Sequence, residues 1–184
     1  GFFIAYLSVP PFIATLGAMK ILRSVTQQFM QSSSPKVPTG FQQIARVKVG
    51  GQMFMPILYW LLIALVLYIV SKKTVFGRHV FAVGSNEKTS RLSGINVNRV
   101  KLGVYALMGA VVAIAAVLQV SRIGAMDPAN AGSGYELDSI AAVIVGGTSM
   151  SGGKGSVVGT VFGMLIIAVM NNLLNLLGVP PFLR

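Results

Sequence analysis

Three long stretches of the chain consist of apolar and small uncharged residues, and the connections between them hold most of the charge. Residues 53–70, 102–121 and 156–178 contain no charged side chain. An α-helix rises about 1.5 Å per residue, so about 20 residues cross the roughly 30 Å hydrocarbon core of a bilayer. The pattern therefore predicts three membrane-spanning helices and an all-α, polytopic membrane protein.

A fourth apolar stretch, residues 1–19, is also uncharged but is interrupted by Pro10 and Pro11. Proline lacks a backbone N–H and is well tolerated in the first turn of a helix. We therefore predict that one span ends before the prolines and that a new helix begins at them. Because the chain begins with Gly1 inside this stretch and ends at Arg184, we expect it to be a fragment of a longer protein.

The composition supports a lipid environment. Hydrophobic residues make up 54% of the chain and charged residues 10%, whereas soluble domains contain roughly a quarter charged residues. The net charge of +11 lies mainly in the connections, so it indicates membrane orientation rather than nucleic-acid binding. With no cysteine and one histidine in the chain, no metal site is expected.

The charges of the connections predict their sides of the membrane. Residues 72–101 hold seven basic residues and one acid, whereas residues 122–138 hold one basic residue and three acids. Because basic connections stay in the cytoplasm, residues 72–101 are predicted to be cytoplasmic. The loop-rich connection at residues 20–52 is then predicted to be outside despite its five basic residues. Lys20 and Arg23 can belong to a helix rather than to the loop.

The cytoplasmic connection contains the signals of a short helix. Ser85 or Asn86 can cap its N-terminus, Glu87 falls in its first turn, and Gly94 can end it in a left-handed conformation. Such a short, well-capped helix between two spans suits the docking of a partner protein. An ordinary amphipathic surface loop with basic anchors is the alternative.

Residues 135–148 are too short for a comfortable full span. Glu136 and Asp138 fall where a helix N-terminus would begin, and acids are favourable there. The stretch is predicted to be either a half-membrane helix covered by protein or a tilted full span.

The glycine-rich run at residues 146–156 invites comparison with a phosphate-binding loop. The required spacing, G-x-x-x-x-G-K-[ST], is absent because Gly155 follows Lys154 where a hydroxyl residue should stand. Nucleotide binding by this chain is therefore not expected. The glycines instead favour the close approach of helix ends.

Small residues recur every four positions, at Gly155, Gly159 and Gly163, and all three are predicted to lie on the helix of the last apolar stretch. This spacing permits close helix packing in a membrane. We expect packing within the subunit, with contact between two subunits as the alternative.

Three amides, Asn171, Asn172 and Asn175, are predicted to lie deep in the last apolar stretch. Polar side chains in membrane spans often line a transport path, and an amide can both donate to and accept from sugar hydroxyls. A translocation path is one prediction, and hydrogen bonding between helices is the other.

Three blocks of sequence suggest a family: VPPFIATLGAM, GRHVFAVGSNEKTSRLSGINVNRVK and YELDSIAAVIVGGTSMSGGKGSVVGT. They closely resemble the permease subunits of ribose/galactose/xylose-type ATP-binding-cassette sugar importers, and the likeness is collinear over essentially all 184 residues. It implies that residues 1–184 are a single transmembrane permease domain, as a fragment of a roughly ten-span protein, with a cytoplasmic coupling loop at residues 72–101.

The resemblance also implies a non-catalytic subunit that translocates a monosaccharide across the bacterial cytoplasmic (inner) membrane. The chain itself would need no cofactor, because ATP is bound by a partner. The implied partners are a cytoplasmic ATP-binding subunit, an extracytoplasmic sugar-binding protein and a second permease copy in a homodimer. The family's ATPase-coupling segment falls on Gly84, Asn86, Glu87, Arg91, Leu92 and Gly94.

Two other classes of protein compete with this interpretation. A secondary transporter or channel that works without an ATPase would be expected to hold acids or a charged ring inside the membrane. A membrane enzyme would need a cluster of His, Asp or Glu, and the chain contains one histidine and four acids. Neither pattern is apparent in the apolar stretches.

Overall fold

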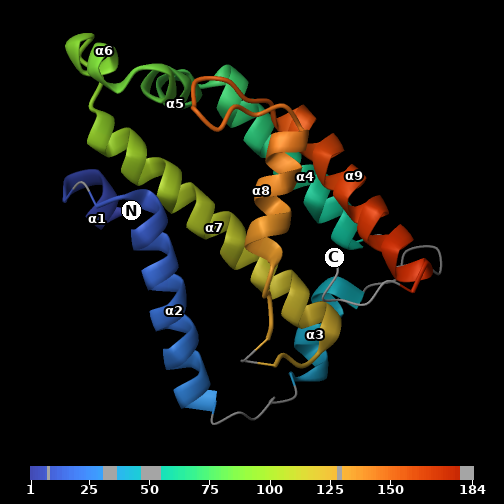
Figure 1. The fold of residues 1–184 in the computed structure, drawn as a ribbon. Coiled ribbons are helices and arrows are strands. Elements are labelled where there is room, and N and C mark those ends of the chain that lie inside the picture. Colours follow the sequence, from blue (N-terminus) through green and yellow to red (C-terminus); the bar gives the residue numbers. More distant parts are fainter. Residues whose placement is uncertain (8, 31–36, 47–54, 128–129, 179–184) are drawn as a thin grey trace. The chain divides into compact units, whose positions relative to one another are not determined.

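The computed structural model describes residues 1–7, 9–30, 37–46, 55–127 and 130–178, and every regular element in this part of the chain is a helix (Figure 1). The all-α prediction is confirmed. The serine- and glycine-rich parts of the first connection and the residues after Gly178 lie outside the described residues. The helices are α1 (Phe2–Tyr6), α2 (Pro11–Met30), α3 (Thr39–Arg46), α4 (Met55–Lys73), α5 (Val75–Ser85), α6 (Glu87–Leu92), α7 (Val97–Ile123), α8 (Tyr135–Val145) and α9 (Val157–Leu176).

By length and composition, three of these helices can cross a membrane. They are α4, α7 and α9, whose mean hydropathies are 1.9, 2.1 and 2.1. Almost none of the residues in their apolar windows are buried within the chain. Exposed apolar surface is unfavourable in water by about 25 cal/mol per Å², so these helices require lipid or further protein around them. The three predicted spans and the polytopic membrane architecture are confirmed.

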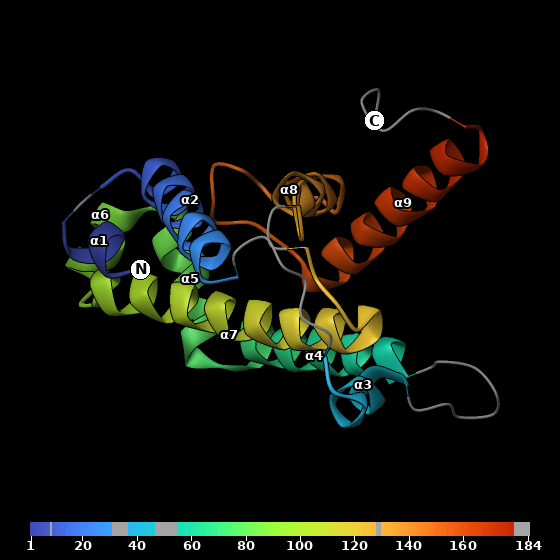
Figure 2. The ribbon, with the colours of Figure 1, turned by 90° about the horizontal axis from the view of Figure 1, so that it is seen from below.

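The chain forms two compact units, of which the first comprises Gly1–Ile63 and Gly94–Ala131. In this unit α1 and α3 both pack on α7. Figure 2 shows α3 beside the C-terminal end of α7. There Ser121 is fully buried, and its Oγ donates a hydrogen bond to the carbonyl oxygen of Phe41 at 2.8 Å. This bond fixes α3 against the end of a span.

The predicted break at the two prolines is confirmed, because α2 begins at Pro11. The loop-rich prediction for residues 20–52 is wrong over two parts, since α2 continues to Met30 and α3 occupies part of the remainder. Lys20 and Arg23 belong to α2, as the alternative held. Arg23 Nη2 donates to the carbonyl oxygen of Ala131 at 3.2 Å. The helix continues because its turn-forming residues come only after Met30.

The second unit comprises Ala64–Ser93 and Gly132–Arg184, and α4 is shared between the two units. In the second unit α8 packs against α9, and α5 contacts α6. The sequence did not predict α5, in which Gly77 and Gly84 lower the intrinsic helix propensity. Thr74 caps this helix: its Oγ1 accepts from the amide of Gly77 at 3.1 Å and donates to the carbonyl oxygen of Val70 at 2.5 Å. This cap permits a sharp turn from α4 into α5.

Helix α8 has 11 residues, a length of about 16 Å at 1.5 Å per residue. It is therefore too short to cross roughly 30 Å of hydrocarbon, and the tilted full span is wrong for this segment. Glu136 and Asp138 lie in its first turn as predicted. The helix stops at Val145 because Gly147, in a left-handed conformation with φ +82°, turns the chain away.

Candidate functional site

The short helix α6 is closed at both ends by local hydrogen bonds. Asn86 caps its N-terminus, and the Asn86 Oδ1 accepts from the amide of Thr89 at 3.0 Å. At the other end, Ser93 donates its amide to the carbonyl oxygen of Thr89 at 3.0 Å, and Gly94 follows at φ +80°. The sequence named Ser85 or Asn86 as the cap, and the structure selects Asn86.

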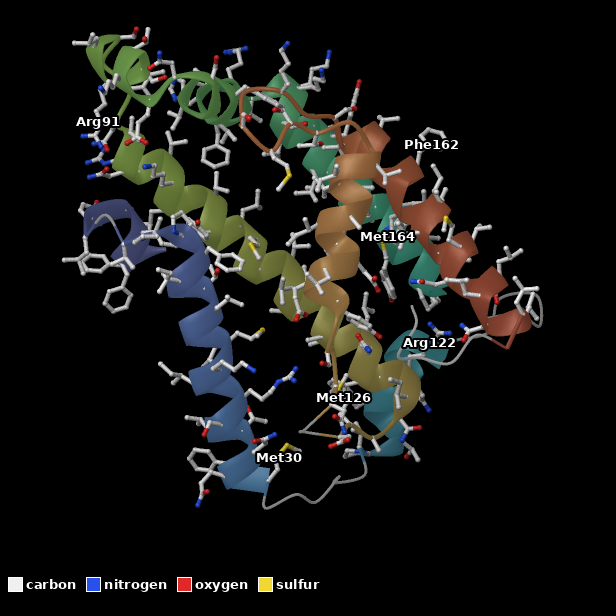
Figure 3. All side chains as sticks on the ribbon, viewed as in Figure 1. Met30, Arg91, Arg122, Met126, Phe162 and Met164 are labelled. Carbon is white, nitrogen blue, oxygen red and sulfur yellow. The ribbon has the colours of Figure 1, made fainter. Side chains whose placement is uncertain are left out.

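The outer surface of α6 combines an ion pair with an apolar side chain. Arg91 Nη2 lies 3.2 Å from Glu87 Oε1, one helical turn away. Arg91 projects from the helix in Figure 3. Leu92 is 89% exposed, although leucine is favourable when buried by about 1.5–3 kcal/mol. A rigid helix with an exposed leucine beside a charged pair is well suited to contact a partner.

Gly84, the remaining predicted coupling residue in this unit, is near the end of α5 and contacts the loop between α8 and α9. A Cβ on Gly84 would lie 2.9 Å from the backbone nitrogen of Gly153. An open hollow of about 350 Å³ adjoins this contact, with Phe81 of α5 and Val143 of α8 among its lining residues. The close approach that the glycine-rich run favoured is present, but the sequence did not indicate that α5 would be its partner.

The glycines of α9 face α8. A Cβ on Gly159 would overlap the carbonyl oxygen of Gly146, and a Cβ on Gly163 would overlap the carbonyl oxygen of Ala142. Phe162 is 61% exposed and projects from α9 away from α8 (Figure 3). These glycines therefore let two helices of the same unit approach to backbone contact.

Gly155 differs from the other two glycines, because it precedes Ser156, the residue that caps α9. It is therefore not on the helix, contrary to the expectation from the spacing of four. A Cβ at this position would lie 3.1 Å from Cγ2 of Thr148. The absence of a side chain at Gly155 thus permits a close contact within the loop rather than between α8 and α9.

The three amides of the predicted translocation path lie in the last six residues of α9. Asn171 is half-buried, whereas Asn172 and Asn175 are exposed. Asn171 and Asn175 share one face because they are one turn apart. The structure thus places two of the three amides on one face, near the C-terminal end of the helix and not deep in the span as predicted.

Comparison with known proteins gives a family match over the whole chain. The family described as the permease component of a branched-chain amino acid transport system matches residues 1–184. The chain is 43% identical to the ribose import permease protein of Escherichia coli, over 99% of this chain and 58% of the relative. It is 42% identical to the ribose import permease protein of Bacillus subtilis, over 99% of this chain and 57% of the relative.

A third relative carries another name. The galactose/methyl galactoside import permease protein of Escherichia coli is 40% identical, over 99% of this chain and 56% of the relative. The chain thus spans little more than half the length of these relatives. No solved structure matches it. Since the family match covers every residue and the structure supplies three apolar helices of spanning length, the chain belongs to this family of transport-system permease components.

Proposed function

We propose that this chain is part of the membrane-spanning permease subunit of an ATP-binding-cassette importer. The cargo is a monosaccharide of the ribose, galactose/methyl galactoside or xylose class. The observation that carries the proposal is the identity of 40–43%, over 99% of this chain, to permeases named for ribose and for galactose import. The chain itself catalyses no reaction and binds no cofactor, because ATP is hydrolysed on a separate subunit.

The cytoplasmic ATP-binding subunit docks on the segment that contains α6. The positive charge of residues 72–101 supports their cytoplasmic position. The cap at Asn86 and the turn at Gly94 hold the helix ready for docking, so little conformational entropy is lost on binding. The exposed Leu92 supplies apolar area, and Glu87 with Arg91 supplies a charge pattern for specificity.

The transport cycle is alternating access in the bacterial cytoplasmic (inner) membrane. ATP binding closes the ATPase subunits and displaces α6, and the permease exchanges its outward and inward openings. A sugar-binding protein delivers the cargo outside, and a second permease copy completes a homodimer. Asn171, Asn172 and Asn175 line the path. ATP can drive the exchange only through contacts that differ in free energy between the two states.

The test is co-purification of the full-length permease with its candidate ATPase. The docking variants are the double substitution Glu87→Ala with Arg91→Ala, and separately Leu92→Ser. Because Leu92 is 89% exposed, its replacement removes docking area without disturbing the fold. The matched control is Leu176→Ser. This substitution replaces a leucine that is 80% exposed at the C-terminal end of α9.

We expect the ATPase to co-purify with the native protein and with the control. Both docking variants should retain less of it, with an affinity loss of about 10- to 100-fold for Leu92→Ser. A folded native protein that captures no ATPase would refute the importer assignment and favour a transporter that works without one. Equal capture by all variants would move the docking site away from α6.

A further inference from the structure

Three glycines bring the coupling segment and the loop between α8 and α9 into backbone contact. A Cβ on Gly84 would lie 2.9 Å from the backbone nitrogen of Gly153. A Cβ on Gly152 would overlap the carbonyl oxygen of Gly84, and a Cβ on Gly153 would lie 2.8 Å from Cα of Ser85. Real Cβ atoms essentially never come within 3.0 Å of such neighbours. We call the contact of Gly84 with Gly152 and Gly153 the glycine joint.

The loop side of the joint is held by its own backbone hydrogen bonds. The amide of Ser149 donates to the carbonyl oxygen of Lys154 at 3.0 Å, and the amide of Gly152 donates to the carbonyl oxygen of Ser149 at 3.1 Å. Ser156 closes the loop onto α9, since its Oγ accepts from the amide of Gly159 at 3.2 Å. The loop therefore presents a fixed surface to Gly84.

The helices on either side of the loop are locked to each other. The amide of Thr148 donates to the carbonyl oxygen of Val143 at 3.1 Å, which ties the start of the loop to α8. Gly159 and Gly163 hold α9 against α8 at backbone distance. A force applied at the loop thus reaches both helices together, because packed interiors have low compressibility.

We propose that the glycine joint connects the coupling segment mechanically to α8 and α9. Through this contact, a displacement of the coupling segment moves both helices. This inference rests on the proposed function, in which the ATPase moves α6. Gly84 lies two residues before Asn86, the cap of that helix. Side chains absorb displacement by changing rotamer, but at the glycine joint backbone meets backbone, so the displacement passes on. Through α9 it reaches Asn171 and Asn175.

Gly84→Ala tests the joint, because its methyl group would force α5 and the loop apart. Gly109→Ala is the matched control: this glycine is also helical, and a Cβ there would meet nothing within 4 Å. Both variants are placed in the full-length permease, assembled with the ATPase and the sugar-binding protein in vesicles. Co-purified ATPase, ATP hydrolysis and sugar uptake are measured on the same preparations.

Glu87, Arg91 and Leu92 are unchanged in Gly84→Ala, and sugar uptake is compared per ATP hydrolysed by the ATPase that co-purifies with each variant. The sugar imported per ATP hydrolysed should fall about 2- to 30-fold, the range in which substitutions alter coupling between sites. The control should match the native protein. Equal uptake per ATP in Gly84→Ala and the control would overturn the joint. A native protein without bound ATPase would instead overturn the proposed function on which the joint rests.

An engineered disulfide tests whether the two sides of the glycine joint stay in contact during transport. The Cβ positions of Ser85 and Gly153 are 3.0 Å apart, and disulfides usually need about 3.5–4.5 Å, so Ser85→Cys with Gly153→Cys can form one after a small shift. The chain contains no cysteine of its own. Any cysteine elsewhere in the parent is replaced, and single Gly153→Cys measures the strain at φ +75°.

If the joint stays closed through the cycle, the oxidised double variant should import sugar at the same rate as after reduction. Loss of uptake on oxidation, restored by a reductant, would show that the two segments separate during transport and would overturn the proposal. Failure of the disulfide to form under oxidant would also overturn it, because the contact would then be absent from the assembled protein.

Discussion

The packing of α9 on α8 is most directly tested by adding one methyl group at Gly163. The Cβ of Gly163→Ala would overlap the carbonyl oxygen of Ala142 and lie 2.8 Å from the amide nitrogen of Gly146, where ordinary contact begins at 3.4 Å. The two helices must therefore separate by about 1 Å, and such overpacking destabilises a protein by about 1–3 kcal/mol.

The control is again Gly109→Ala, where the added methyl would meet nothing within 4 Å. Alanine is a better helix former than glycine by about 0.5–1 kcal/mol. This gain is common to both variants, so the difference between them isolates the clash. The shift is about 2–4 °C per kcal/mol for 150–250 residues and smaller for a longer chain, so in the full-length permease Gly163→Ala should melt below the control by at most about 12 °C.

The assay is thermal unfolding of the full-length permease in detergent, followed by the loss of the monodisperse peak in size-exclusion chromatography. Double substitution Gly159→Ala with Gly163→Ala should lower the melting temperature further, because both clashes fall on the same face of α9. Equal melting temperatures for Gly163→Ala and Gly109→Ala would refute the reasoning, since α8 and α9 would then not approach to backbone contact.

Two further predictions concern local hydrogen bonds. Asn86→Ala removes the acceptor of the Thr89 amide and should destabilise α6 by about 0.5–2 kcal/mol; faster hydrogen exchange confined to residues 87–92 would show this, and unchanged exchange would contradict the cap. Ser121→Ala removes the buried hydroxyl that donates to the Phe41 carbonyl and should destabilise the first unit by about 0.5–1.5 kcal/mol. Ser139→Ala is its control, because that hydroxyl is exposed and bonds within its own helix; equal melting of the two variants would show that α3 is not held at Ser121.

Local signals in the sequence determined the spans and the short helix α6. A span is specified by the length of an uncharged apolar stretch, and α4, α7 and α9 coincide with such stretches within a few residues. The ends of α6 depend on groups only three or four positions apart, so the roles of Asn86 and Gly94 could be predicted from the sequence. The three blocks of sequence that resemble sugar-importer permeases then indicated the family.

Helices that depend on contacts with residues distant in the sequence were not predicted. Helix α5 was missed, because its glycines lower its intrinsic helix propensity and the sequence does not show what approaches them. At Gly84 the approaching group is Gly153, almost 70 positions later. Helix α3 was likewise missed, since a short polar helix becomes stable only when it packs on a surface such as the end of α7.

The same distinction applies to the glycines of the last stretch. Their spacing of four predicted close packing but left the partner open, because the pattern is the same for contacts within and between subunits. The tertiary structure places Gly159 and Gly163 on α8 and leaves Gly155 in the loop. Helix length and caps depend on neighbouring residues and are therefore set by the sequence itself. Which backbones meet depends on the path of the whole chain, which only the folded structure decides.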